Sequence, residues 1–270
     1  MSEIDVLDVS SGILAKAKEL GASLAGVARV DDLKKAPSYT VTPLMEPYSG
    51  VGANKERTSD LKYGEVTWSG DARSVVVVAF AHPGDQPELD YWYGSIDPIG
   101  NKKLIEVVNG LIGWLKDKYG ILAFHLPYHI ERGGIYLKDA AVCAGLGCIG
   151  RNNLLVTPEY GPRIRLRGLT VPIDLPPIVP AAFDPCAVCD QICRRSCPQD
   201  SFEEVVYTGF EFGRKELPGR DGSFNRISCN TQMKDDEESA VEQEVPDIGK
   251  TVRVVKYCRR CELSCPVGRG

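Results

Sequence analysis

Cysteine spacing is the feature of this sequence that most directly indicates chemistry. The first run, CAVCDQICRRSCP, contains Cys186, Cys189, Cys193 and Cys197. The second run, YCRRCELSCPVG, contains Cys258, Cys261 and Cys265. Closely spaced thiolates of this kind bind the irons of one cluster, and the cysteine that precedes proline reaches a second cluster. With Cys229 between the runs, the eight cysteines suffice for two [4Fe–4S] clusters with four thiolates each.

Zinc and disulfides are the alternatives to this interpretation. Zinc also takes four cysteines and uses C-x2-C pairs, but it rarely uses four cysteines on one short segment that ends in proline. Disulfides need an oxidising compartment. The first residues, MSEIDVLDVSSGILAKAKEL, lack the apolar core and the cleavage site of a signal peptide. We therefore expect a cytoplasmic protein with reduced thiols, and zinc is the stronger of the two alternatives.

Composition sets the limits of the fold and of the partners. The chain has 270 residues, 43% of them hydrophobic, and a net charge of −5. It has no apolar run near the ~20 residues that span a bilayer, and no basic excess that would attract nucleic acid. Eight of the ten cysteines follow the proline-rich segment 171–185. We expect an α+β domain over residues 1–180 and a cluster-binding domain over residues 181–270.

Hydrophobic periodicity predicts the elements of the first domain. Helices are expected over residues 7–20, 102–119 and 135–144. Strands are expected over residues 25–30, 74–81 and 121–130, with 154–156 and 164–171 paired to each other. Residues 36–70 show no period and either wrap a neighbouring element or cover a site. The mixture indicates an α+β layer fold.

The glycines of AGLGCIGRN, residues 144–152, match G-x-G-x-x-G. A dinucleotide fingerprint requires a strand before the glycines and a helix after them. Here the preceding residues look helical and the following ones look like a strand, so we do not predict NAD or FAD binding. Two interpretations remain: a glycine-rich corner between helix and strand, or a backbone that comes close to a large flat cofactor.

The segment AGLGCIGRNNLLVTPEYGPRIRL resembles the AGLG-x-IGKN segment of the epoxyqueuosine reductase family, a relative of the corrinoid-dependent reductive dehalogenases. The order of a cysteine run ending in CP, a lone cysteine in FNRISCN and a final C-x2-C-x3-CP is similar to that family as well. The resemblance covers about residues 70–265. It implies a nitroreductase-like α+β domain that binds cobalamin, followed by a ferredoxin-like domain with two [4Fe–4S] clusters.

The resemblance also implies roles for individual residues. One cluster would be held by Cys186, Cys189, Cys193 and Cys265. The other would be held by Cys197, Cys229, Cys258 and Cys261. Contacts to cobalamin are expected from Gly145, Gly147, Cys148, Gly150, Asn152 and Arg163. Glu131 stands where the family has its catalytic aspartate, and a glutamate can also donate a proton.

The sequence departs from the family pattern in several places. Asp190-Gln191-Ile192 is one residue longer than the usual spacer between the second and third cysteines, and Cys148 replaces a tryptophan. The chain stops five residues after Cys265, without the helical-repeat extension that many epoxyqueuosine reductases carry. Together with the net charge of −5, this makes tRNA an unexpected substrate.

Other candidates have both structural and functional interpretations. Cys143 and Cys148 are expected to pack in the core rather than act as redox thiols, and His82 to be structural. The arginines 151, 163, 165 and 167 line either a solvated strand face or the edge of a cofactor. The acidic stretch 235–247 is a solvated face or a docking patch for a basic partner.

These observations predict an iron–sulfur oxidoreductase that passes electrons through two [4Fe–4S] clusters to a corrinoid or to a substrate on the α+β domain. The alternative is a non-catalytic electron carrier, or reductive activase, that donates electrons to a partner corrinoid protein. A low-potential donor such as ferredoxin or flavodoxin is the expected redox partner, with a corrinoid or a corrinoid protein as the acceptor. Neither nucleic acid nor membrane is an expected partner.

Overall fold

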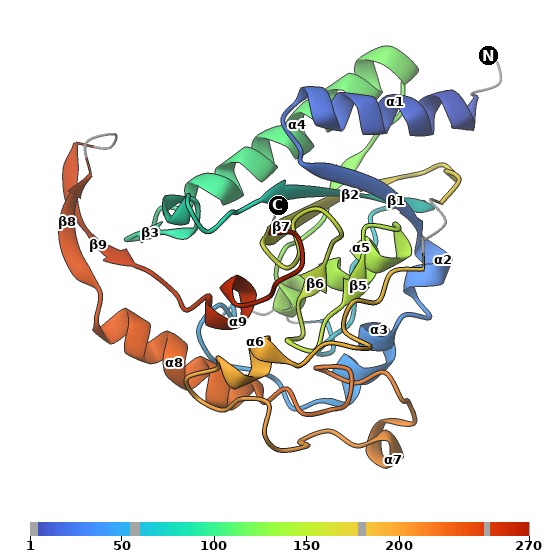
Figure 1. Cartoon of the computed structure of the whole chain (residues 1–270). Coiled ribbons are helices and arrows are strands. Elements are labelled where there is room, and N and C mark those ends of the chain that lie inside the picture. The colour runs from blue at the N-terminus through green and yellow to red at the C-terminus, as the bar shows by residue number, and fades with distance from the viewer. Residues whose placement is uncertain (1–4, 55–59, 178–181, 246–248, 270) are drawn as a thin grey trace.

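A four-stranded antiparallel sheet forms the centre of the molecule (Figure 1). The computed structural model describes residues 5–54, 60–177, 182–245 and 249–269. The strand order is β1 (Leu24–Arg29), β2 (Ser74–Ala81), β7 (Ile164–Val171) and β4 (Phe124–His125). β2 pairs along its whole length with β7, from Ser74 opposite Val171 to Ala81 opposite Ile164. The run of valines in β2 is buried because both faces of the sheet are covered.

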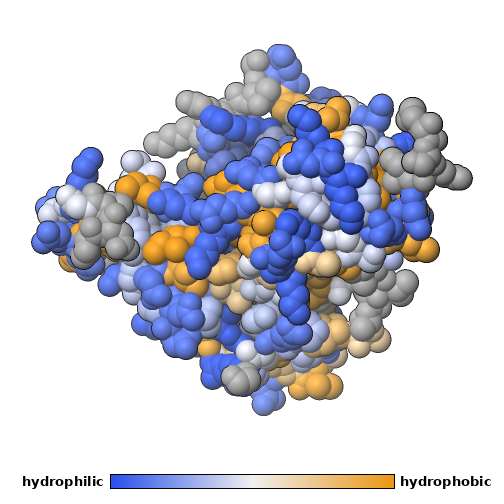
Figure 2. All heavy atoms as spheres, turned by 90° about the horizontal axis from the view of Figure 1, so that it is seen from above, coloured by the Kyte–Doolittle hydropathy of each residue, from blue (hydrophilic) through white to orange (hydrophobic). Residues whose placement is uncertain are grey.

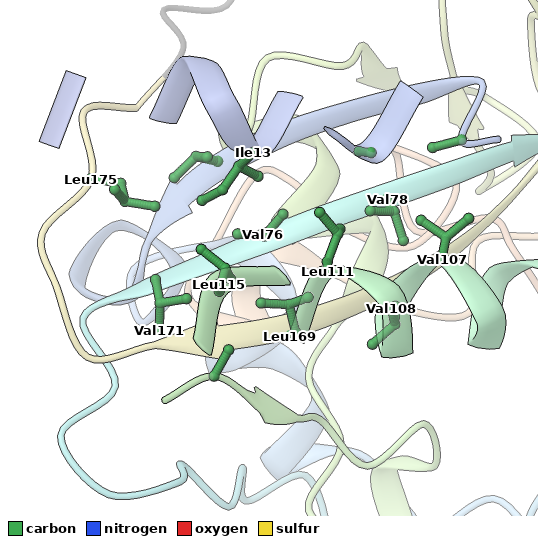
Figure 3. Packing of buried hydrophobic residues seen from close by; sticks show 14 of the residues in the cluster. Ile13, Val76, Val78, Val107, Val108, Leu111, Leu115, Leu169, Val171 and Leu175 are labelled. Atoms are coloured by element: carbon green, nitrogen blue, oxygen red, sulfur yellow. The ribbon is translucent and has the colours of Figure 1, made fainter. Parts of the chain in front are cut away.

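Helices pack on both faces of this sheet. α1 (Val6–Glu19) and α4 (Ile99–Tyr119) cover one face, where Ile13 and Leu111 meet Val76 and Leu169 (Figure 3). α2 (Val30–Leu33) and α5 (Leu137–Cys143) lie against the other face with Val75. Successive residues of β2 therefore contribute to two different cores, as the alternation of side chains along a strand requires.

The short elements of the first half connect these layers. They are α3 (Pro37–Val41), η1 (Thr42–Leu44), η2 (Pro87–Asp90), β3 (Trp92–Tyr93), η3 (Ile130–Arg132), β5 (Cys148–Ile149) and β6 (Leu155–Val156). The cysteine-rich half contains α6 (Ile192–Arg195), α7 (Gly209–Phe212), α8 (Arg226–Glu238), β8 (Val241–Val245), β9 (Lys250–Val255) and α9 (Arg260–Leu263).

The β8–β9 hairpin extends away from the body (Figure 1). Its second strand pairs with β3, so a three-stranded sheet joins residues from both sides of position 180. The division into domains at that position stays a prediction.

The predicted mixed α+β class is confirmed. The helix expected over 102–119 is α4, and it ends at Gly120 in the left-handed conformation, with φ of 67°. The long strand expected over 121–130 is wrong, because only Phe124 and His125 are extended in β4. Pro127, which has no N–H for a ladder, follows two residues later, and the chain then turns into η3.

The predicted pairing of 154–156 with 164–171 is also wrong. β6 pairs with β5, whereas β7 lies between β2 and β4. Thr157 and Gly161 bond each other through both backbone groups, at 2.9 and 3.0 Å, and close a tight turn between the two strands. β7 carries eight residues into the central sheet, where its side chains bury more apolar area than a two-residue hairpin would.

None of the helices in the described ranges is long and apolar enough to cross a bilayer. Seen from the side of α1 and α4, the surface carries hydrophilic side chains over much of its area, with apolar side chains between them (Figure 2).

Candidate functional site

The fold gathers the eight cysteines of the two runs into two groups. In the first group, Cys193 lies within electrostatic range of three others: Cys186, Cys189 and Cys265. In the second group, Cys261 lies within electrostatic range of Cys197, Cys229 and Cys258. We call these groups the first quartet and the second quartet. Their membership is the crossed one that the sequence resemblance implies, and the role of these thiols as cluster ligands stays a prediction.

The first quartet surrounds a small cavity. The cavity is lined by Cys186, Cys189, Cys193 and Cys265, together with Pro185, Pro266 and neighbouring residues. The extra residue of the first run is absorbed at Gln191, which adopts the left-handed conformation with φ of 58°. Its carbonyl oxygen then accepts from the N–H of Arg194 at 2.9 Å and opens the short helix α6. The longer spacer therefore still allows Cys193 to join the group.

The second quartet comes from four places in the chain: Cys197 follows α6, Cys229 lies in α8, Cys258 precedes α9 and Cys261 lies in α9. The side chain of Asn225 accepts from the N–H groups of Ile227 and Ser228 and fixes the start of α8, whose first turn carries Cys229. The Asp236 carboxylate accepts from the N–H of Cys258 at 2.7 Å. These contacts hold two thiols of different segments in one place.

Burial and mutual repulsion act on the thiols of both quartets. Burial raises the pKa of Cys193 to about 11, and the charges of Cys265, Cys186 and Cys189 add to the rise. Burial likewise raises the pKa of Cys261, and the charges of Cys229 and Cys258 raise it further. Thiolates in such a setting need a cation, and a bound cluster would provide several iron ions and displace the thiol protons. The residues present therefore fit two clusters.

Within the described ranges, no three His, Cys, Asp or Glu side chains are grouped to hold one metal ion. The thiolates of a cubane each bind a different iron, so they stand farther apart than the ligands of one ion.

The quartets differ in exposure. The exposed fractions of Cys186, Cys193 and Cys265 are 8%, 8% and 7%, so the first quartet is mostly buried. Cys258 of the second quartet is exposed. A redox partner could therefore approach the second quartet more closely than the first.

The glycine-rich corner follows α5 and leads into β5, which is the inverse of a dinucleotide-binding turn, as expected. A side chain at Gly147 would collide with the carbonyl oxygen of Val156, and one at Gly150 would lie 2.6 Å from the Val156 side chain. The close approach of β6 thus requires glycine at these positions, and the structure favours the helix-to-strand corner over a cofactor-facing backbone.

Asn152 of this corner and Arg163, which precedes β7, hold the cysteine segments. Buried Arg163 donates to the carbonyl oxygens of Cys265 at 3.1 Å and Glu262 at 3.4 Å, and also to that of Val267. The Asn152 amide donates to the carbonyl oxygen of Cys261 at 3.3 Å. These residues tie both quartets to the α+β part of the molecule.

Several of the six residues predicted to contact cobalamin have partners inside the chain. Gly147 and Gly150 pack against β6, and Asn152 and Arg163 bind the C-terminal cysteine segment. Gly145 takes the left-handed conformation, with φ of 76°, at the end of α5. Burial raises the pKa of Cys148 to about 11, and Cys186 and Cys265 lie within electrostatic range. The role of these six residues in binding a corrinoid stays a prediction.

Glu131 lies in a different place, on the half-buried loop of η3. Tyr48 is within electrostatic range of Glu131 and also of Cys229. The hydroxyl of Tyr48 donates to the side-chain oxygen of Asn230 at 2.8 Å, and the N–H of Val51 donates to the same oxygen at 2.7 Å. Tyr48 thus contacts the residue next to Cys229 and is within electrostatic range of Glu131.

This contact also explains part of the aperiodic stretch 36–70. Residues 48–51 are fixed to Asn230 beside Cys229, and the N–H of Thr67 donates to the carbonyl oxygen of Gly133 at 2.9 Å. We call residues 42–54 and 60–67 the covering segment, because Tyr48 and Val51 bind Asn230 beside Cys229 and Thr67 binds the end of the η3 loop. Of the two possibilities for this stretch, these contacts favour the one in which it covers a site.

A buried charge network was missed by the sequence analysis. Asp90 lies 2.8 Å from His82 Nδ1, 3.0 Å from Arg165 and 2.8 Å from Arg259. Glu262 adds a 3.0 Å contact to Arg165. Burial would raise the pKa of Asp90, but the hydrogen bond from His82 and the nearby arginines lower it overall. The network fixes the segment between Cys258 and Cys265 to the sheet.

The four clustered arginines consequently have structural partners rather than a solvated or cofactor-facing role. Arg151 donates to the carbonyl oxygen of Cys186 at 3.1 Å, and the guanidinium of Arg167 lies 4.2 Å from the centre of the Tyr128 ring. Sequence reasoning could not have found these contacts, because the partners are backbone carbonyls, an aromatic ring and, for Arg165, the distant acids Asp90 and Glu262.

An α+β fold with two four-cysteine groups beside its central sheet has the architecture of an iron–sulfur protein. Comparison with known proteins agrees with this class, although no family model matches the chain. The epoxyqueuosine reductase of Listeria monocytogenes is 32% identical over 224 residues, which cover 74% of this chain and 49% of the relative. That of Lactococcus garvieae is 26% identical over 216 residues, or 74% of this chain and 53% of the relative.

Solved structures show the same fold. A Bacillus subtilis epoxyqueuosine reductase superposes with a TM-score of 0.60 and 19% identity, over 98% of this chain and 67% of that one. A reductive dehalogenase described as B12-dependent superposes with a TM-score of 0.58 and 17% identity, over 100% of this chain and 34% of that one.

Over most of its length, the chain is similar to the epoxyqueuosine reductases and to related reductive dehalogenases. The resemblance predicted from the sequence is thus confirmed. The chain spans about half the length of the curated epoxyqueuosine reductases that it matches.

Proposed function

We propose that this chain is an iron–sulfur oxidoreductase that passes electrons through two [4Fe–4S] clusters to a corrinoid or to a substrate bound on its α+β part. The observation that supports this most directly is the crossed assembly of eight cysteines into two quartets. In this proposal residues 1–180 are a nitroreductase-like domain and residues 181–270 a ferredoxin-like domain. The protein works in the cytoplasm, where its thiols stay reduced.

The chain's own residues have distinct tasks in this function. The first quartet would hold one cluster and the second quartet the other. Each cluster supplies one-electron transfer at a potential that depends on charge, hydrogen bonds and exposure. The N–H of Ser201 donates to the Cys197 sulfur at 3.4 Å, a contact that stabilises negative charge on the second quartet. Exposed Cys258 leaves the second quartet accessible from outside the chain.

Glu131 is the proposed proton donor. It lies on the η3 loop, and Tyr48 is within electrostatic range of both Glu131 and Cys229. A substrate that received electrons beside the second quartet could take its proton from this carboxyl group. An acceptor site here, rather than at the glycine corner, agrees with the packing of Gly147 and Gly150 against β6.

The second candidate is an electron carrier, or reductive activase, that donates electrons to a partner corrinoid protein. Several residues predicted to contact cobalamin have partners inside the chain instead. This favours the carrier, because a carrier needs no corrinoid-binding site of its own. The acidic α8 also contacts Cys258 through Asp236, so its charges lie beside the exposed quartet and could meet a basic partner.

The test uses anaerobically purified protein reconstituted with iron and sulfide. The proposal predicts about eight irons per chain and reducible clusters. Zinc without iron would contradict both candidates. Cobalamin is then titrated, and the cobalt spectrum is followed before and after a low-potential reductant is added. Stoichiometric uptake and cobalt reduction support the corrinoid branch.

Glu131→Gln separates enzyme from carrier, with Glu106→Gln on the exposed side of α4 as the matched control. An enzyme that uses Glu131 loses substrate reduction in the first variant alone, while its clusters still accept electrons. Unchanged electron delivery to an acceptor protein in both variants, without cobalamin uptake, supports the carrier.

A further inference from the structure

Two cations lie close together beside the covering segment. Lys138 is the second residue of α5 and Arg226 is the first residue of α8, so they come from opposite halves of the chain. They are within electrostatic range of each other. Within the described ranges, neither forms an ion pair with a carboxylate. The nearest acid along the chain, Asp139, instead accepts from the hydroxyl and the N–H of Ser38.

Most of the hydrogen-bonding capacity of the two cations is unused by the described residues. The Lys138 ammonium donates to the carbonyl oxygen of Asn153 at 2.6 Å, which takes one of its three N–H groups. Arg226 donates through Nη2 to the carbonyl oxygen of Val51 at 3.4 Å. A guanidinium has five N–H donors in a planar fork that suits carboxylate and phosphate oxygens.

Bringing these cations together has an electrostatic cost. Burial lowers the pKa of Lys138 to about 8, the charge of Asp139 opposes this, and the charge of Arg226 lowers it further. Two cations in a partly desolvated site destabilise each other unless a counter-ion is present. An anion that bridged them would remove this repulsion and use the free N–H groups.

The position of the pair connects it with the proposed reaction site. The Arg226 guanidinium lies 4.5 Å from the centre of the Tyr48 ring and within electrostatic range of Cys229. Tyr48 in turn is within range of Glu131. Arg226, the proposed proton donor and a thiol of the second quartet therefore lie around one aromatic side chain, and Lys138 is within electrostatic range of Arg226.

We propose that Lys138 and Arg226 form an anion-binding site that receives the carboxylate or phosphate group of the molecule reduced beside Glu131. This inference rests on the proposed function and deepens it, because it assigns the substrate to the class of anionic compounds. Binding of the anionic group to the cation pair would place the rest of the substrate near Tyr48, between the proton donor and the second quartet.

Direct binding tests this site without an activity assay. Cluster-loaded full-length protein is titrated by calorimetry, under anaerobic conditions, with inorganic phosphate in one arm and benzoate in the other. The site predicts one equivalent bound in at least one arm. Binding of phosphate alone assigns a phosphate-bearing substrate, and binding of benzoate alone assigns a carboxylic acid. Sodium chloride at equal ionic strength serves as the control for general salt effects.

Substitutions locate the binding. Lys138→Gln and Arg226→Gln should each weaken anion binding about tenfold, because each removes a charge-assisted contact. Arg226→Lys keeps the charge, so it should retain part of the affinity and remains informative if a neutral variant fails to fold. Lys102→Gln, on the exposed side of α4, should bind as the wild type does.

Failure of the inference can be distinguished from failure of the proposed function. Wild-type protein with about eight irons that binds neither anion overturns the anion site and leaves the two-cluster proposal intact. Equal affinity in wild type, Lys138→Gln and Arg226→Gln also overturns it. Absence of iron overturns the proposed function itself.

Discussion

The two quartets use the same side chain in different surroundings. The first quartet is mostly buried, and Arg163 and Arg151 donate to the backbone around it. The second quartet includes exposed Cys258 and lies beside the covering segment, which binds Asn230. The difference indicates a division of work: the first quartet joins the two halves of the chain, and the second faces partners and substrate.

Cysteine substitution should separate the quartets most strongly. Cys193→Ser and Cys258→Ser should each leave about four of eight irons, because each removes one ligand of one cluster. Cys193→Ser should also lower the thermal midpoint much more than Cys258→Ser, since it weakens the buried connection. Iron analysis and thermal unfolding measure the two effects. Equal loss of stability in both variants would remove the proposed division.

Arg163→Gln tests the attachment of the first quartet. The substitution removes hydrogen bonds from a buried guanidinium to the carbonyl oxygens of Cys265 and Glu262, and should cost about 3 kcal/mol. Loss of a nearby positive charge should also make the potential of the first cluster more negative. Unfolding and redox titration followed by electron paramagnetic resonance report the two changes.

Arg214→Gln is the matched control for this prediction. Arg214 also donates to a backbone carbonyl, that of Lys35 at 3.0 Å, but the contact is exposed. Arg214→Gln should change the stability little, and it should leave the reduction potentials of both clusters unchanged. A shift of the first cluster's potential in this control, equal to that in Arg163→Gln, would contradict the assigned role.

Gly147→Ala should have a smaller effect. Its Cβ would collide with the Val156 carbonyl, and the shift of β6 should cost about 2 kcal/mol. Gly113→Ala, at an exposed position in α4 with nothing near the added Cβ, should instead stabilise the protein by about 0.8 kcal/mol. Chemical denaturation compares the pair. If Gly147→Ala were neutral, the corner would have room for another occupant.

The sequence predicted the features that depend on local pattern. The valines of β2 and the apolar spacing of α4 defined the central layers, and the spacing of the cysteines indicated two clusters. The register of β6 could not be predicted, because a two-residue strand has too little hydrophobic pattern to choose its partner.

The remaining features depend on contacts between distant residues. Asp90 meets Arg259, and Tyr48 meets Asn230, across separations that no periodicity reports. The glycines of the corner resembled a cofactor motif because tight backbone packing and cofactor approach both require a missing side chain.

The crossed membership of the quartets is the central claim, and ligand substitution followed by electron paramagnetic resonance tests it directly. Serine in place of a cysteine ligand alters the spectrum of the cluster that it binds. The structure predicts that Cys265→Ser perturbs the same reduced cluster as Cys186→Ser, and that Cys261→Ser perturbs the other cluster together with Cys197→Ser. If Cys265→Ser and Cys261→Ser perturbed the same cluster, the crossed arrangement would be contradicted.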